Sequence, residues 1–224
     1  MRTVRKAPSG GVRRGLGAIA LAAGVTATVP TFAAHLEIGA GYSWGRRDAN
    51  GFWVQNQNPH VMKLNSPTWY AGVGGHSWRY LAWHVDFVHL GTYGENSWDT
   101  SDQAAAAGLT CANATCYNFV GSGVSNGVRF TAGPTFGVDH WHLTLQGGLF
   151  LYDSTWHVVV YNTAGQPVAH LDHWNRIQVG DVVGASLRYR AFSLNVDRYV
   201  MRAPQDYYQP LIYGATTVTA GWEF

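Results

Sequence analysis

Ile212-Tyr-Gly-Ala-Thr-Thr-Val-Thr-Ala-Gly-Trp-Glu-Phe224 ends the chain with residues that alternate in polarity. One set of alternate positions holds Val218, Ala220, Trp222 and Phe224, and the other holds Thr217, Thr219, Gly221 and Glu223. Successive residues of a strand point to opposite faces, so the stretch predicts a strand with one apolar and one polar face. A soluble domain rarely ends on a bare aromatic, whereas the last strand of a membrane barrel faces lipid with its apolar side. The stretch therefore favours a closing barrel strand over a strand of a soluble sandwich, with Trp222 and Phe224 as the assembly signal.

The first 34 residues have the pattern of an export signal. Five basic residues precede an apolar stretch over residues 15–29, and a small-residue cleavage site follows around Ala33 and Ala34. We therefore expect residues 1–34 to be a cleaved signal peptide and residues 35–224 to form one β-barrel domain. Because a membrane barrel must arrive unfolded, we expect Sec-type export. Periplasmic chaperones and the barrel assembly machinery would then deliver the chain to the outer membrane.

Removing this leader reverses the charge balance. The whole chain has 15 Lys and Arg against 13 Asp and Glu, and five of the basic residues lie in the leader, which leaves 10 against 13 and a formal charge of −3. The whole-chain pI of 8.6 is therefore no argument for a nucleic-acid partner. No apolar run of about 20 residues follows the leader, so a membrane form must be a closed barrel.

Period-two alternation predicts an all-β chain of eight antiparallel strands in an up-and-down meander. We expect strands over residues 35–45, 68–77, 80–90, 128–134 at the end of the fourth, 141–151, 183–189 at the end of the sixth, 194–196 within the seventh, and 212–224. Long polar stretches at 46–67, 91–119, 153–176 and 201–210 alternate with tight turns at Trp78-Arg79, Gly137-Val138-Asp139 and Arg190-Ala191. This order places both termini and the short turns in the periplasm and the long loops outside the cell. The third loop has a strand-like stretch at 156–161 and the turn-forming pair Ala164-Gly165, which together predict a hairpin.

The polar face of these strands carries charges, which a soluble lipocalin-like barrel would not turn inward. We expect a lumen charge network of Glu37, His84, Asp86, Arg129, Arg188, Asp197 and Glu223. Asp86 and Arg129 lie at similar distances from the turns beside them, so they should meet near mid-barrel, where Asp197 and Arg188 could join them. The network is either a salt-bridged plug or a gate for small solutes, and the narrow bore of an eight-stranded barrel favours the plug.

The chain resembles the small outer-membrane barrels of the OmpA type. The sharpest matches are the Phe224 terminus, the segment Trp83-His84-Val85-Asp86-Phe87 running into Gly91, and the segment 127–134 before a short turn. The resemblance implies an eight-stranded porin-like barrel in the cell envelope of a Gram-negative bacterium. Because the sequence stops at Phe224, we expect no periplasmic peptidoglycan-binding domain.

Two clusters are candidates for other chemistry. Cys111 and Cys116, the two cysteines of the chain, predict a small disulfide in an exported protein, with a thiol or metal role as the alternative. His170, Asp172 and His173, with His157 across the expected hairpin, form a weak candidate for zinc or copper; a solvated polar loop is favoured. No cofactor is expected.

The external loops remain as the place where function would reside. The leading hypothesis is a structural or surface-interaction protein that binds host or envelope components through loop aromatics, which are Trp53, Trp98, Tyr207 and Tyr208. A narrow solute channel is the second hypothesis. A lipid-modifying enzyme is the third and is disfavoured, since the chain has no His-x-Ser-Asn run and we assign no catalytic residue.

Outer-membrane lipids are the remaining expected partners. Trp44, Trp69, Trp83, Trp141 and Trp222 fit an interfacial girdle. Strict alternation places Arg198 and Asp181 outward, so either a bulge turns them in or Arg198 pairs with a lipopolysaccharide phosphate.

Overall fold

The computed structural model describes residues 34–47, 60–78, 80–98, 117–174, 177–201 and 212–224. These residues fall in one compact unit, Ala33–Phe224. Helices with the length and hydrophobicity of a membrane span are absent from the described ranges.

Ten strands make up the described part of the chain, and all pair antiparallel. They are β1 (His35–Arg47), β2 (His60–Lys63), β3 (Asn65–Trp78), β4 (Leu81–Trp98), β5 (Tyr117–Val138), β6 (Trp141–Asn162), β7 (Pro167–Trp174), β8 (Gln178–Tyr189), β9 (Phe192–Val200) and β10 (Ile212–Glu223).

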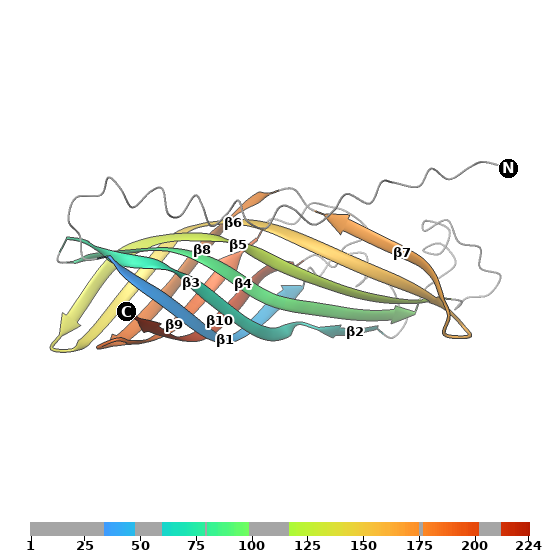
Figure 1. Ribbon diagram of the computed structural model, residues 1–224, viewed down its shortest axis with the longest axis horizontal. Helices are drawn as coiled ribbons and strands as arrows, with labels where there is room; N and C mark the ends of the chain where they lie inside the picture. Colours follow the sequence, from blue (N-terminus) through green and yellow to red (C-terminus); the bar gives the residue numbers. More distant parts are fainter. Residues whose placement is uncertain (1–33, 48–59, 79, 99–116, 175–176, 202–211) are drawn as a thin grey trace. The chain divides into compact units, whose positions relative to one another are not determined.

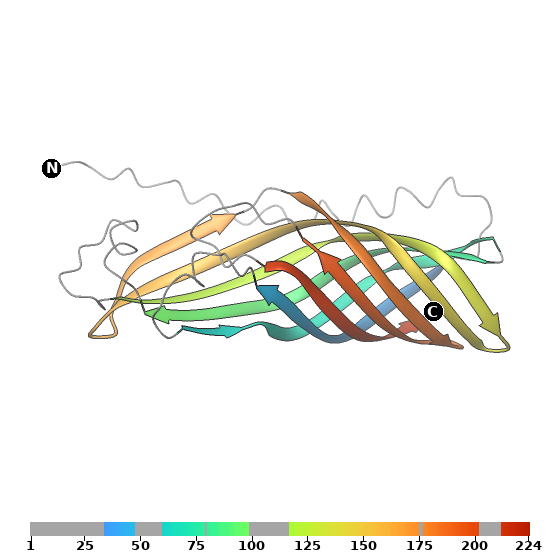
Figure 2. The same cartoon turned by 180° about the vertical axis from the view of Figure 1, so that it is seen from behind.

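Eight of these strands close into a ring. The pairing order is β1, β3, β4, β5, β6, β8, β9, β10, and β10 then returns to β1 (Figure 1; Figure 2). At the seam between the first and last strands, Glu37 pairs with Glu223 and Ile38 with Trp222. The predicted eight-stranded antiparallel meander is confirmed. β2 pairs only with β4, and β7 only with β6, so both lie outside the ring.

The short turns, the start of β1 and the end of β10 lie together at the left of Figure 1. The β8–β9 ladder reaches Tyr189–Phe192, so the turn is Arg190-Ala191, as expected, and Arg190 has a φ of 55°. The β5–β6 turn differs slightly from expectation. β5 continues through Val138, so the turn falls at Asp139-His140, where Asp139 has the positive φ of 53° that such two-residue turns require.

Three strands run well past their predicted limits. β4 continues from residue 90 to Trp98, β5 already begins at Tyr117, and β6 runs through residue 151 to Asn162 before a turn leads into β7. The stretches predicted as loops at 91–119 and 153–176 are therefore partly strand. The hairpin predicted within the third loop is present as β6 and β7, with Gly165 at the turn in the left-handed conformation (φ 75°). The second predicted strand, 68–77, begins earlier than expected, because β3 starts at Asn65. β2 lies within the stretch predicted as the first loop.

An apolar belt covers the outside of the ring. Its exposed side chains include Ile38 and Trp44 on β1, Trp69 on β3, Phe130 on β5, Leu143, Leu145, Leu149 and Leu151 on β6, Val179 and Val183 on β8, Leu194 and Val196 on β9, and Trp222 and Phe224 at the C-terminus. On β6 the belt runs from Trp141 to Leu151. At about 3.3 Å per residue and a tilt of about 40°, that run spans about 25 Å, the height of the lipid-facing band of such barrels.

Candidate functional site

A buried ion network lies inside the ring. Arg129 on β5 donates from Nε and Nη2 to Oδ2 of Asp86 on β4, at 2.9 and 2.6 Å. Its Nη1 donates to Oδ2 of Asp197 on β9, at 2.5 Å, and Gln146 Nε2 donates to the other oxygen of Asp197 at 2.6 Å. Asp86 and Asp197 are 0% and 1% exposed, so one guanidinium is shared by two carboxylates that are buried away from solvent. We call these four residues the lumen network.

Aromatic side chains complete the packing around Arg129. Its guanidinium lies over the Tyr70 ring, 5.2 Å from the ring centre, and Asn195 donates to the Tyr70 hydroxyl at 2.9 Å. Tyr199, Phe150 and their neighbours form an apolar cluster inside the same ring. Asn195 and Tyr199 were not among the predicted network residues. Both are separated from Asp197 by two positions on β9, and this spacing could have identified them as inward-facing.

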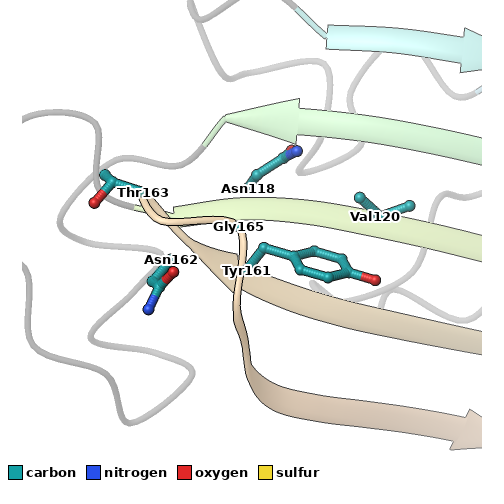
Figure 3. A pocket seen from close by; sticks show the side chains of 6 residues that line it. All are labelled: Asn118, Val120, Tyr161, Asn162, Thr163 and Gly165. Carbon is teal, nitrogen blue, oxygen red and sulfur yellow. The ribbon is translucent and has the colours of Figure 1, made fainter.

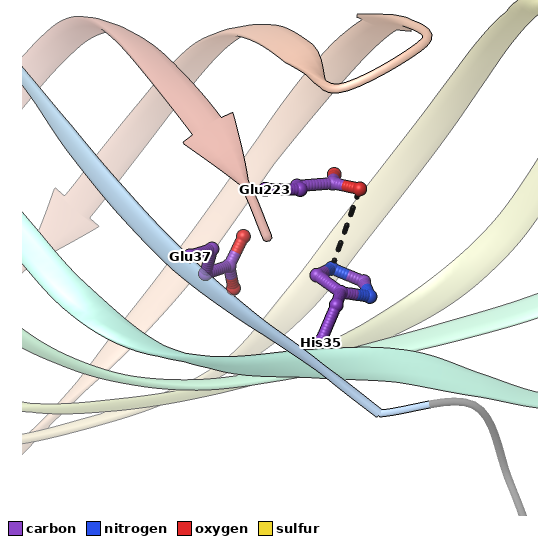
Figure 4. A group of neighbouring side chains, drawn as sticks. All are labelled: His35, Glu37 and Glu223. Atoms are coloured by element: carbon purple, nitrogen blue, oxygen red, sulfur yellow. Dashed lines mark ion pairs between the residues drawn. The ribbon is translucent and has the colours of Figure 1, made fainter.

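Four of the predicted lumen charges lie elsewhere, near the end of the ring with the short turns. His84 Nδ1 lies 2.7 Å from Glu37 Oε1, and Arg188 Nη1 donates to Glu223 Oε2 at 2.9 Å. His35 Nε2 lies 3.5 Å from the same Glu223 oxygen (Figure 4). Arg188 therefore pairs with Glu223 rather than with the Asp86–Arg129 pair. We call these five residues, His35, Glu37, His84, Arg188 and Glu223, the mouth cluster. His35 was not predicted to belong to it, because it lies at the first position of the first predicted strand, where the inward or outward direction of a side chain is not set by a preceding residue.

Arg198 and Asp181 both remain on the outer face. The β8–β9 ladder runs from Asp181 to Tyr189 without a register shift, so no bulge turns either side chain inward. Arg198 Nη1 donates to Thr216 Oγ1 at 2.8 Å, and Asp181 is exposed. The proposed contact of Arg198 with a lipopolysaccharide phosphate stays a prediction.

Beyond the apolar belt, the long strands form what we call the external extension: β2, β7 and the adjoining ends of β4, β5 and β6, at the right of Figure 1. It has a core of its own, in which Phe119, Trp156, Val158 and Val160 are buried and Tyr117 and Ala169 pack against them. The described residues of the extension therefore form a packed sheet structure.

A hollow of ≈ 360 Å³ lies at the tip of the extension, which we call the tip pocket (Figure 3). It is lined by Asn118 and Val120 on β5 and by Tyr161, Asn162, Thr163 and Gly165 at the β6–β7 turn. Asn162 holds this turn in place, since its Oδ1 accepts hydrogen bonds from the backbone N–H groups of Ala164 and Gln166, at 3.0 and 2.9 Å. Asn118 Oδ1 is buried without a hydrogen-bond partner in the described structure.

The other predicted site residues are only partly described. The β6–β7 ladder pairs His157 with Asp172 and Trp156 with His173, as the hairpin hypothesis required of the backbone, while the side chains of Asp172 and His173 lie outside the description. The metal role of His170, Asp172 and His173 stays a prediction. Cys111, Cys116, Trp53, Tyr207 and Tyr208 lie outside the described residues, and of Trp98 only the backbone is described, at the end of β4.

A closed eight-stranded ring with an apolar belt outside and paired charges inside defines a transmembrane β-barrel. No protein-family model matches the chain, and no curated protein matches it. Among solved structures, it is similar to the crystal structure of Ail, the attachment invasion locus protein of Yersinia pestis, in complex with the heparin analogue sucrose octasulfate. That match has 14% identity and a TM-score of 0.42, over 87% of this chain and 100% of Ail. The Ail backbone structure in a phospholipid bilayer nanodisc matches at 14% identity and a TM-score of 0.30, over 85% and 99% of the two chains.

Proposed function

We propose that this protein is an outer-membrane scaffold that binds ligands at the cell surface through its external extension. The observation that carries the proposal is that β4, β5 and β6 continue far past the belt as one packed sheet, which crossing a membrane does not require. A surface that is already ordered loses little conformational entropy when it binds a ligand.

The tip pocket is the binding site we assign within the extension, and its chemistry fits a neutral oligosaccharide. None of its lining residues is charged. Tyr161 offers an aromatic ring on which a sugar ring can stack. Asn118 Oδ1 is buried without a partner in the described structure, and rotation of this amide into the pocket would let it accept from a sugar hydroxyl.

Binding of purified protein to immobilised neutral oligosaccharides, measured by surface plasmon resonance, tests this proposal. Tyr161→Ala and Asn118→Ala should each weaken binding at least about tenfold, which corresponds to about 1.4 kcal/mol. Tyr80→Ala is the matched control, because it removes an exposed tyrosine at the opposite end of the ring. Equal affinity of all three variants, or a preference for sulfated polysaccharide over neutral sugars, would contradict the assignment.

A further inference from the structure

The seam of the barrel brings two glutamates face to face. Glu37 on β1 and Glu223 on β10 are direct partners in the antiparallel ladder, and both side chains point inward. Like charges directly opposite each other on neighbouring strands are destabilising. Arg188 supplies one cation to this pair, through Glu223, so the mouth cluster retains an unbalanced negative charge whenever its histidines are neutral.

Nitrogen and oxygen ligand atoms converge at this seam. One atom each from His35, Glu37 and Glu223 lies within 4.8 Å of the other two, and His35 Nε2 lies 3.5 Å from Glu223 Oε2 (Figure 4). Ligands of a tetrahedral zinc ion, each about 2.0–2.2 Å from the metal, lie about 3.3–3.5 Å apart. Small side-chain rotations therefore suffice to bring the three atoms to coordinating positions.

Two further features concern the surroundings of these ligand atoms. His35 Nε2 is buried and has no hydrogen-bond partner in the described structure. A Cβ atom on Gly74 of β3 would lie 2.8 Å from His84 Nδ1, 2.9 Å from His35 Nε2 and 3.1 Å from Glu37 Oε1. These three side chains can therefore approach the β3 backbone this closely only because residue 74 has no side chain.

Neighbouring residues hold the carboxylates in place. His84 Nδ1 contacts Glu37 Oε1 at 2.7 Å and holds that carboxylate in place. Arg188 holds Glu223 from the other side. Outer hydrogen bonds of this kind orient the ligands of metal sites. His84, Arg188 and the three ligand residues all retain some side-chain exposure, between 5% and 20%, which gives an ion access from the mouth of the barrel.

We propose that His35, Glu37 and Glu223 bind a divalent transition-metal cation of the zinc class, with His84 and Arg188 as positioning residues. Imidazole and carboxylate ligands suit Zn²⁺, and a water molecule completes a four-coordinate site. Because its ligands come from β1 and β10, the ion fastens the first strand to the last at the point where the barrel closes. This site is independent of the surface function proposed above.

Calorimetric titration of Zn²⁺ into metal-free protein purified from outer membranes tests the site, after mass spectrometry has verified that His35 is present. Saturable binding of one ion per chain is expected, together with a rise in thermal midpoint on adding Zn²⁺. His35→Ala and Glu223→Gln should each weaken Zn²⁺ binding at least about tenfold, whereas His84→Ala should weaken it about 10- to 100-fold with the stoichiometry unchanged. Co²⁺ serves as a spectroscopic probe, and the intense visible absorption of four-coordinate Co²⁺ is expected.

His170→Ala is the control, since it removes a histidine of the external extension and leaves the mouth cluster intact. Full binding by His35→Ala, or a tenfold loss in His170→Ala, would overturn the proposal, as would the absence of saturable binding. Should Glu223→Gln fail to assemble, His35→Ala decides the question alone, because it leaves the Arg188–Glu223 ion pair and the pairing of residue 35 with Gly74 in place.

Discussion

Replacing Arg129 with methionine removes the cation that two buried carboxylates share. Wild-type Arg129 makes three charge-assisted hydrogen bonds, two to Asp86 and one to Asp197. Breaking a buried ion pair by removing one partner costs about 3–5 kcal/mol, because the remaining charge stays buried. In the variant, Asp197 still accepts a hydrogen bond from Gln146, whereas Asp86 loses both of the hydrogen bonds that Arg129 donated to it. Most of the cost in free energy of unfolding therefore arises at Asp86. We expect the free energy of unfolding to fall by about 4 kcal/mol.

Urea titration of the barrel in lipid vesicles, followed by tryptophan fluorescence, measures this loss. Asp86→Asn in the Arg129→Met background should recover about 2 kcal/mol, since it neutralises the carboxylate left without its partner. Planar-bilayer recordings of the same variants distinguish a plug from a gate. A loss below about 1 kcal/mol would refute the energetic reasoning, because it would lie within the range of an exposed ion pair. A stable conductance in Arg129→Met would instead show that the lumen network gates a pore.

Three further predictions concern other parts of the chain. Trp156→Ala should open a cavity in the extension core and destabilise the extension by about 3–5 kcal/mol, seen as faster limited proteolysis of the extension while the heat-dependent shift in gel mobility of the barrel persists. Adding a polar tail after Phe224 should lower the yield of folded protein in the outer membrane, measured by that same gel shift; an unchanged yield would remove its role as an assembly signal. Cys111 and Cys116 should resist thiol labelling until reduced, and immediate labelling of both in native protein would exclude the disulfide.

The ring was predictable from sequence because one physical rule governs every strand within the belt. Lipid outside and a narrow lumen inside force apolar and polar residues to alternate, as Leu143, Leu145 and Leu149 do against Thr144 and Gln146 on β6. The same rule identified Asp86 and Arg129 as inward and neighbouring. Asp197 was expected to join them and does contact Arg129, although β9 does not pair with β5, whereas Arg188 pairs with Glu223 instead. Strand neighbours alone do not determine which charges meet across the lumen. Arg188 was misplaced for that reason.

The strand limits were wrong for a different reason. Beyond Leu151 the leucines of the outward positions give way to Asp153 and His157, which suggested a loop. The inward positions change in the opposite sense, from Thr144 and Gln146 to the buried Trp156 and Val158. Period-two alternation thus continues through Val158 with its polarity inverted, so the stretch 156–161 was predicted as a separate strand within the third loop and not as a continuation of the strand that begins at Trp141.

This inversion has a physical cause that also bears on function. Inside the membrane a strand must present apolar side chains to lipid, and outside the membrane the same face meets water while the inward face must form a core. The change from apolar to polar outward residues between Leu151 and Asp153 on β6 therefore marks the membrane boundary on the side of the external extension, and the strand continues across it without a break. Because the tip pocket is built on β5 and β6, its residues are held by the same ladder that crosses the bilayer. A ligand at the tip therefore meets a preorganised surface whose position is fixed by the barrel itself.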